Sequence, residues 1–140
     1  MPTKKAAPAE EPKSGGYKVE NVSLLESVFS RVINFDSKDG EITNEINIDS
    51  QALESIESNK FGVTLELNFE GKQADKIICN SKIKMIGIFE VIGEPALTED
   101  VFKRINAPAI IYPFIREHLH NICLKAGIVN VLLPTVNFKV

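Results

Sequence analysis

Apolar and polar residues alternate without interruption between Phe61 and Glu70, and this is the clearest pattern in the chain. A period of two places one set of side chains on one face of a strand and the other set on the opposite face. The apolar set is Phe61, Val63, Leu65, Leu67 and Phe69. The pattern predicts a strand with one buried and one largely solvated face, followed by a turn at 70–72.

Three other segments are predicted as strands. Residues 17–35 are rich in β-branched and aromatic side chains, and the Asp, Ser and Gly residues of 36–40 favour a turn. Isoleucines share one face of a strand at 42–49, and 49–59 is interpreted as a long connection. The fourth strand, 76–92, becomes apolar on both faces towards its end. Burial of both faces indicates a second layer beyond the chain's own helix.

The spacing of apolar residues changes to three and four after residue 106, as in an amphipathic helix. Asn106 is placed to cap this helix, Pro108 suits its first turn, and Pro113 either begins the regular part or kinks it. Gly127 is placed to end it in a left-handed conformation. A shorter helix is predicted at 98–105, with its first residue as the cap. The face of the long helix expected to be buried comprises Phe114, Ile115, Leu119, Ile122, Cys123 and Ala126.

Strands followed by helices predict an α+β domain, a four-stranded antiparallel sheet packed with one long and one short helix. A chain of 140 residues suffices for one domain with a sizeable core. Residues 1–16 contain hardly any large apolar side chain, which predicts a disordered N-terminal arm and places the domain at 17–140. One long helix leaves a face of the sheet or of the helix uncovered, and a second copy of the chain is the economical cover.

Composition and charge argue against several classes of protein. A net charge of −3 and a pI near 5.4, without a basic stripe, argue against nucleic acid as a partner. No apolar run approaches the roughly 20 residues of a membrane helix, and no apolar segment follows Lys4 and Lys5 as it would in a secretory signal. Cys79 and Cys123 lie far apart within apolar patterns, which favours buried, reduced thiols in a cytoplasmic protein over a disulfide or a metal pair.

No pattern typical of catalysis occurs in the chain. It lacks the nucleophile-elbow, zinc-protease, phosphate-loop and C-x-x-C motifs. His118 and His120 would project about 200° apart on a helix, which is unsuited to sharing a metal. Glu99 and Asp100 are better explained by a helix start than as a catalytic pair. The sequence therefore predicts a protein that is not an enzyme and has no metal and no cofactor.

Three short segments resemble the SecB family of export chaperones. They are Gly87–Val91 in the last strand, Tyr112–Glu117 in the long helix and Leu133–Phe138 near the C-terminus, in this order and spacing. The resemblance covers the chain from about Ile46 onward and extends, less closely, over 19–35. It implies a dimer of dimers with strands and the long helix at the interfaces. The interface residues expected on the helix are Ile115, Leu119, Ile122 and Cys123.

Large apolar side chains outnumber those that one small core plainly needs. Many must fill the core and the interface between copies. The resemblance implies another role for the remaining apolar side chains. They would line an exposed groove beneath the segment that follows Gly127, where unfolded clients bind. The candidates for this groove are Phe29, Phe61, Phe69, Met85, Phe89, Tyr112, Phe114, Leu132, Leu133, Val136 and Phe138.

The resemblance also implies delivery of clients to the translocase motor SecA through an acidic surface of the sheet. Glu26 and Glu66 are the candidate docking residues. Ser30 and Asn80 stand where the family pattern has acidic residues, and the sequence stops two residues after Phe138, without the family's C-terminal helix. A divergent member of the family is therefore expected.

The sequence leads to one main hypothesis and two alternatives. The main hypothesis is an ATP-independent holdase that binds unfolded or precursor polypeptides in exposed apolar grooves, with delivery to the Sec translocase. The first alternative is a chaperone dedicated to a single partner such as an antitoxin. The second is a structural oligomeric scaffold that binds no client.

Overall fold

The structure is a computed structural model, and it describes residues 15–129, 131 and 133–138, apart from the side chain of Ser37. The predicted N-terminal arm therefore lies outside the described residues except for its last two glycines. Four antiparallel strands form one sheet in the order β1-β4-β3-β2. Their bounds are Gly16–Arg31 for β1, Thr43–Ala52 for β2, Lys60–Gln73 for β3 and Lys76–Ile92 for β4.

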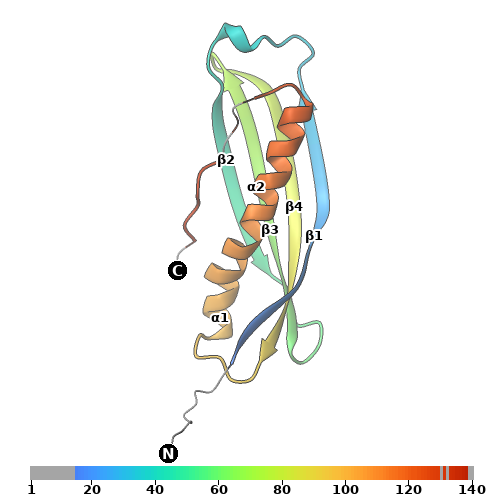
Figure 1. Cartoon of the computed structure of the whole chain (residues 1–140), viewed down its shortest axis with the longest axis vertical. Coiled ribbons are helices and arrows are strands. Elements are labelled where there is room, and N and C mark those ends of the chain that lie inside the picture. Colours follow the sequence, from blue (N-terminus) through green and yellow to red (C-terminus); the bar gives the residue numbers. More distant parts are fainter. Residues whose placement is uncertain (1–14, 130, 132, 139–140) are drawn as a thin grey trace, which may run out of the picture.

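The helices follow the strands and form one continuous rod. It begins with α1 (Glu99–Val101), passes through a π-helical turn (Phe102–Asn106) and continues as α2 (Ala107–Lys125). Figure 1 shows α2 lying lengthwise across one face of the sheet, over β3 and β4. A short 3₁₀ turn, Ser37–Asp39, lies between β1 and β2. The predicted α+β fold is confirmed.

Side chains of β3, β4 and α2 fill the core between the sheet and the helix. The alternating apolar residues of β3 all face α2 and are buried, as the period of two predicts. At the N-terminal end of the rod, Tyr17 stacks on Phe102 with ring centroids 4.0 Å apart, and Phe102 meets the edge of Phe89 at 5.2 Å. These aromatic contacts hold the start of β1, the end of β4 and the start of the helical rod together.

The turn predicted at 70–72 is wrong, because β3 continues to Gln73. The hairpin turn lies instead at Ala74 and Asp75, whose φ angles are +51° and +64°. Gly71 belongs to the ladder and pairs with Cys79. A Cβ at Gly71 would lie 2.8 Å from the Cys79 Sγ, so this glycine serves close packing and not a chain reversal.

Two other predicted boundaries differ from the structure. β1 ends at Arg31, four residues before the predicted end of the first strand, and the next residues form a loop. β2 extends to Ala52, so the predicted connection of 49–59 is shortened to 53–59. The strand predicted at 76–92 agrees with β4 at both ends.

Asn106 is not a helix cap, because its backbone is helical, with φ −75° and ψ −44°, and its side chain makes no capping hydrogen bond. The helical rod begins earlier, at Thr98, whose hydroxyl oxygen accepts a hydrogen bond from the Val101 N–H at 3.3 Å. Gly127 ends α2 with φ +78°, as predicted. The N–H of Ile128 then bonds to the Cys123 carbonyl at 2.9 Å, which completes a Schellman motif.

The buried stripe of α2 is rotated slightly from the predicted one. Ile111, Ile115, Leu119 and Cys123 are fully buried against the sheet. Phe114, which was predicted to be buried, is 50% exposed. The reason is that the helix continues upstream of Pro113, so the residues at three-and-four spacing from Ile111 fill the core and leave Phe114 on the outside.

Candidate functional site

The candidate site lies where the chain folds back along α2 after Gly127. The residues described beyond this glycine (128, 129, 131 and 133–138) are called the C-terminal segment below, and they run beside α2 without forming a helix or strand. The Tyr112 hydroxyl donates a hydrogen bond to the Pro134 carbonyl oxygen at 2.7 Å. The Tyr112 ring also meets Phe138 edge-on, with centroids 6.2 Å apart. Tyr112 thus fixes the segment to the helix at two points.

A pocket of about 220 Å³ opens between α2 and the C-terminal segment. Its walls combine apolar side chains, of which Leu119, Val131 and Leu133 are buried, with polar groups at the rim. The His120 Nδ1 lies 3.4 Å from the Val131 carbonyl oxygen, across the rim. The lining residues are Pro113, Arg116, Glu117, Leu119, His120, Val131 and Leu133.

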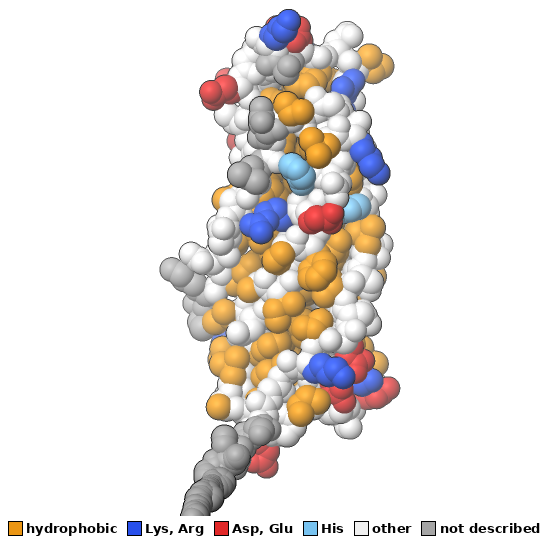
Figure 2. All heavy atoms as spheres, in the orientation of Figure 1, with side chains coloured by type: hydrophobic (Ala, Val, Ile, Leu, Met, Phe, Trp, Pro, Cys, Tyr) orange, Lys and Arg blue, Asp and Glu red, His pale blue; other side chains and the backbone are white. Residues whose placement is uncertain are grey.

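Charge on the rim of this pocket comes from two neighbouring residues of α2. The Arg116 guanidinium lies over the Tyr112 ring, 5.8 Å from its centroid. The Glu117 carboxylate accepts a hydrogen bond from the Asn121 side-chain amide one turn further along the helix. Figure 2 shows this side of the molecule, where hydrophobic side chains cover much of the surface and charged groups are sparse between the two ends.

A second apolar surface lies on the opposite flank of α2, beside the edge strand β1. Val19 pairs with Phe89 and Leu24 pairs with Met85, so both project to the side of the sheet that carries α2. These two residues, with Phe114 of α2, form the β1–α2 surface, and each is 39–50% exposed. The Ser27 Oγ lies 2.9 Å from the His118 Nε2 and connects the strand to the helix within this surface.

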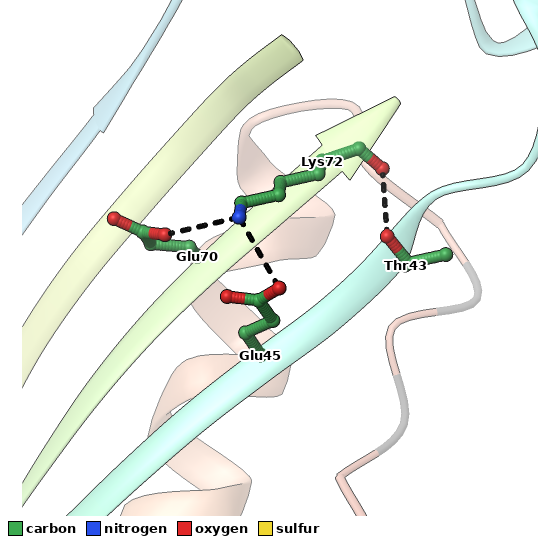
Figure 3. A network of polar contacts seen from close by, with 4 residues as sticks. All are labelled: Thr43, Glu45, Glu70 and Lys72. Atoms are coloured by element: carbon green, nitrogen blue, oxygen red, sulfur yellow. Dashed lines mark hydrogen bonds and ion pairs between the residues drawn. The ribbon is translucent and has the colours of Figure 1, made fainter. Parts of the chain in front are cut away.

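The opposite face of the sheet carries an apolar patch, where Leu53, Ile86 and Ile88 meet over Gly62, and is otherwise mostly polar. Glu26 and Glu66, the predicted docking residues, both pair with Lys84 from either side, and the structure therefore brings them together on this face. Glu26 also forms an ion pair with Lys82 at 3.4 Å. Near the start of β2 on this face, the Lys72 ammonium lies 3.1 Å from Glu45 and 3.9 Å from Glu70 (Figure 3). Lysines thus neutralise part of the acidic charge here.

Most of the predicted groove residues lie in the core and not on a surface. Phe61, Phe69, Met85, Phe89, Tyr112 and Leu133 are at most 8% exposed. In this conformation they cannot form the wall of an open groove, apart from Leu133 at the pocket. Phe29, Val136 and Phe138 are half-buried, Phe114 is exposed, and Leu132 lies outside the described residues. The structure therefore gathers Tyr112, Leu133, Val136 and Phe138 around the C-terminal segment and separates Phe29, Phe61, Phe69, Met85, Phe89 and Phe114 from it.

The helix residues predicted for the interface between copies are also buried within one chain. Ile115, Leu119 and Cys123 are at most 1% exposed because they face the sheet, and Ile122 is half-buried. Residues on the outward side of α2, including Phe114 and Leu124, are the ones available to a partner. An interface between copies can therefore use the helix only through these outward residues.

The two thiols are both free and buried, in β4 and α2. Burial raises the pKa of the Cys123 thiol to about 11, and the nearby Cys79 thiol acts in the same direction. Burial also raises the pKa of Cys79. Such thiols remain protonated and unreactive near neutral pH.

Within the part of the chain that the structure describes, no cluster of three or more His, Cys, Asp or Glu side chains is arranged to hold a metal ion. Among the helices of that same part, none has both the length and the apolar character needed to cross a bilayer.

The sheet order, the single long helix and its position define a SecB-like fold. The SecB-like chaperone of Mycobacterium tuberculosis, solved with a peptide from an antitoxin, matches this chain with a TM-score of 0.68 over 89% of each chain, at 13% identity. The family model for SecB, the preprotein translocase subunit, matches residues 18–140. The chain therefore belongs to the SecB family, and the resemblance noted in the sequence is confirmed.

Curated relatives in this family include two proteins called protein-export protein SecB. The one from Methylobacillus flagellatus is 30% identical over 90 residues, which are 64% of this chain and 57% of that protein. The one from Anaplasma phagocytophilum is 30% identical over 111 residues, 71% of this chain and 69% of that protein. The match to the first relative thus covers little more than half of its length.

Arg116, His120 and Val131 were not predicted to form a site. The sequence signal that could have predicted this site is Gly127. A chain that reverses direction at this glycine runs back along α2 and brings Val131 close to the helix.

Proposed function

We propose that this chain is a chaperone that holds non-native polypeptides in the cytoplasm, without ATP and without catalysis. The observation that carries the proposal is the open, partly apolar pocket between α2 and the C-terminal segment. Membership of the SecB family supports it. Clients would be unfolded or precursor polypeptides, bound through apolar side chains at this pocket.

The energetics of such a surface favour weak, reversible binding. Burial of ~500 Å² of apolar surface contributes on the order of 12 kcal/mol, at about 25 cal/mol per Å². Ordering each residue of an extended client costs about 1–2 kcal/mol of backbone entropy. One pocket therefore binds weakly, whereas several copies in one particle bind a long chain strongly by raising its effective concentration. A client that folds buries its apolar segments and is released.

Self-association through the β1–α2 surface would supply the several copies. The outer edge of β1 offers unpaired backbone groups over most of its 16 residues, and exposed Val19 and Leu24 flank that edge on the helix side. Phe114 extends the apolar area onto α2. A second copy related by a two-fold axis would cover both the edge and the apolar side chains, as a first step towards a dimer of dimers.

Two measurements test the proposal together. The chain should suppress aggregation of an unrelated denatured protein at a near-stoichiometric ratio without nucleotide, while light scattering reports an oligomer. Leu24→Glu should lower the particle mass, because it places a charge in the interface. Lys76→Glu, an exposed change elsewhere on the sheet, should leave the mass unchanged. A chain that fails to suppress aggregation at any ratio is not a general holdase.

A chaperone dedicated to one partner is the second candidate, and the fold neighbour that was solved with an antitoxin peptide favours it. The same aggregation assay separates the two candidates. A dedicated chaperone leaves the unrelated protein to aggregate and solubilises only a cognate partner, such as an antitoxin encoded next to it. A scaffold without clients does neither.

Delivery to SecA is proposed for the polar face of the sheet, through Glu26 and Glu66. The pairing of both residues with Lys84 places them on one surface. The nearby lysines reduce its negative charge, so we expect weak and salt-sensitive binding. Glu26→Lys combined with Glu66→Lys should abolish binding to SecA in sedimentation experiments while client holding persists.

A further inference from the structure

A small apolar patch interrupts the face of the sheet that lies away from α2, called the outer face below. The side-chain methyl groups of Leu53, Ile86 and Ile88 converge over Gly62, where an added Cβ would lie 3.4–3.5 Å from each of them. These three side chains are half-buried, and Ile92, further along β4 on the same face, is 44% exposed. The four apolar side chains are called the outer-face patch. An exposed apolar patch rimmed by polar residues is typical of a docking surface.

An acidic row crosses all four strands beside this patch. Its members are Asp49 of β2, Glu66 of β3, Lys84 of β4 and Glu26 of β1, paired in that order. Asp49 and Glu66 lie directly opposite each other, and like charges in this position destabilise a sheet. Among the described residues, neither of these two carboxylates takes part in an ion pair. The acidic row therefore favours the approach of further cations.

The charges at the other end of the patch are balanced. Glu90 pairs with Lys18 on one side and with Lys60 on the other. Lys60 also forms an ion pair with Glu20 at 3.2 Å. Two ammonium groups and two carboxylates thus lie at this end, so the outer face is more acidic beyond the patch than before it.

The small size of the patch argues for an occupant that is already attached to the chain. A separate protein needs an interface of roughly 1,000 Å², and four side chains, three of them half-buried, offer much less. A tethered segment needs less area because its effective concentration is high. The chain has such a segment at the right place, because Gly16 pairs with Ile92 and the N-terminal arm therefore enters the sheet beside the patch. At Gly15 an added Cβ would lie 2.3 Å from the Glu94 backbone, so the attachment point is packed closely against this end of the sheet.

The order of residues in the arm matches the order of features on the outer face. Traced back from its attachment point, the arm first presents Glu10 and Glu11, then the small apolar run Ala6–Ala9, and finally Lys4 and Lys5. The outer face presents the end with balanced charge, then the patch, and then the acidic row. The two lysines of the arm thus correspond to the carboxylates of the row.

The distances agree with this order. At about 3.3 Å per residue along β4, Ile86 lies ~20 Å from Ile92 and the acidic row lies ~27 Å from it. An extended chain can reach ~20 Å between Gly15 and Ala9, and ~33 Å between Gly15 and Lys5. The apolar run of the arm therefore reaches the patch, and its lysines reach the row with a few ångströms to spare.

We propose that the N-terminal arm binds to the outer face of its own sheet, with Ala6–Ala9 on the patch and with Lys4 and Lys5 at the acidic row. The bound arm covers Glu26 and Glu66. Any partner that docks through these two carboxylates therefore competes with the arm for the same surface. The contact itself does not depend on the proposed function, and only the competition with SecA rests on it.

Paramagnetic NMR on the full chain tests the contact. Thr3→Cys introduces a thiol that a nitroxide reagent labels selectively, because Cys79 and Cys123 are buried. A docked arm should broaden the methyl signals of Ile86 strongly. The methyl signals of Ile110, which lies in α2 on the other side of the sheet, should be broadened much less.

Exchange of charges between the arm and the row identifies the partners. Lys4→Glu combined with Lys5→Glu should remove most of the broadening at Ile86. Asp49→Lys combined with Glu66→Lys should remove it as well. All four substitutions together should restore it, because the ion pairs form again with reversed signs. High salt should weaken the contact in the native chain.

Two further variants of the arm leave the folded domain untouched. Ala7→Asp places a charge against the patch and should weaken the broadening. Lys13→Glu is the matched control, because this lysine lies only two residues before Gly15 and cannot reach the acidic row. It should leave the broadening unchanged.

The results separate the inference from the proposed function. Equal broadening of Ile86 and Ile110, or failure of the fourfold exchange to restore the contact, would overturn the inference. Broadening that appears only between spin-labelled and unlabelled copies in a mixture would overturn it too, because it would assign the patch to a second copy of the chain.

Sedimentation with SecA tests the competition. The variant with Lys4→Glu and Lys5→Glu should bind SecA at least about threefold more tightly than the native chain does. Equal binding of SecA to both chains would overturn the competition. Absence of SecA binding to either chain, with the arm contact seen by NMR, would overturn delivery to SecA and leave the arm contact in place.

Discussion

The Arg31 guanidinium caps the C-terminal end of α2, where its Nη1 donates a 2.8 Å hydrogen bond to the Ala126 carbonyl oxygen. The same group donates to the carbonyl oxygens of Val32 at 3.0 Å and Ile33 at 3.3 Å, and it lies 6.0 Å from the centre of the Phe35 ring. One side chain thus satisfies backbone groups of the loop after β1 and an end carbonyl of the helix. A cation at this position also complements the negative end of the helix dipole.

Arg31→Lys should therefore destabilise the chain although it keeps the charge. An ammonium cannot reproduce the planar fork that reaches three carbonyl groups, and we expect the free energy of unfolding to fall by about 1 kcal/mol. Urea unfolding followed by circular dichroism measures the change. Lys76→Arg, an exposed substitution outside this contact, is the control. A stability of Arg31→Lys equal to that of the native chain would show that charge alone matters at this helix end.

Gly71→Ala should destabilise the sheet through a single clash. The added Cβ would lie 2.8 Å from the Cys79 Sγ, and overpacking of this kind costs about 1–3 kcal/mol. In a Cys79→Ala background the obstructing sulfur is absent, so the cost of Gly71→Ala should fall to less than half. Unfolding free energies of the two single variants and the double variant form a double-mutant cycle. Additive effects would show that the strand, and not the sulfur, requires glycine.

Stability should decline at alkaline pH because of the buried Cys123 thiol. Its pKa is 9.0 in an unfolded chain and about 11 in the fold, so the unfolded chain loses this proton first. The stabilising contribution is complete below pH 9 and is lost as the pH rises towards 11, by up to about 2 kcal/mol. Urea unfolding between pH 8 and 10.5 under reducing conditions should show this decline. Cys123→Ala should reduce the slope, whereas an unchanged slope would assign it to other groups.

Tyr112→Phe should release the C-terminal segment while the rest of the domain stays folded. The substitution removes the 2.7 Å hydrogen bond to the Pro134 carbonyl oxygen and keeps the buried ring. We expect a loss of about 1 kcal/mol of local stability and faster amide hydrogen exchange in the segment than in β3. Tyr17→Phe, which removes a comparable 2.7 Å bond to the Leu97 carbonyl oxygen, is the matched control and should leave the segment unchanged. Equal exchange in the two variants would contradict the role of Tyr112.

The sequence predicted those elements whose signals are local. β4 was bounded correctly because its alternation of residues ends at Gly93, and the end of α2 followed from Gly127 alone. Gly71 was misinterpreted because a glycine marks both turns and close packing, and only its cross-strand partner, Cys79, distinguishes the two. Asn106 was taken for a cap because nothing around it in the sequence reveals the π-helical turn that carries the rod through it.

The candidate site was predicted only in part, and the reason is geometric. The surplus of large apolar residues was identified, but a period of three and four does not say which residue on the edge of the stripe faces solvent. Because the helix starts upstream of Pro113, Ile111 lies in the core and Phe114, which was expected there, faces solvent. Arg116 and Val131 are 15 residues apart and meet only because the chain reverses after α2, a contact that no local pattern encodes.

Two phenylalanines that the sequence placed in one groove should now behave differently when each is replaced by Ser. Phe89 is 0% exposed, so Phe89→Ser should lower the free energy of unfolding by about 3–5 kcal/mol. Phe114 is 50% exposed on the proposed interface, so Phe114→Ser should change stability by less than about 1 kcal/mol and lower the particle mass measured by light scattering at a given concentration. If Phe114→Ser kept the native mass, the copies would have to associate through another surface. Phe89 packs against the rings of Phe61 and Phe102, so its loss leaves an unfilled space in the core. Native stability of Phe89→Ser would therefore contradict the packing of the helical rod on the sheet described above.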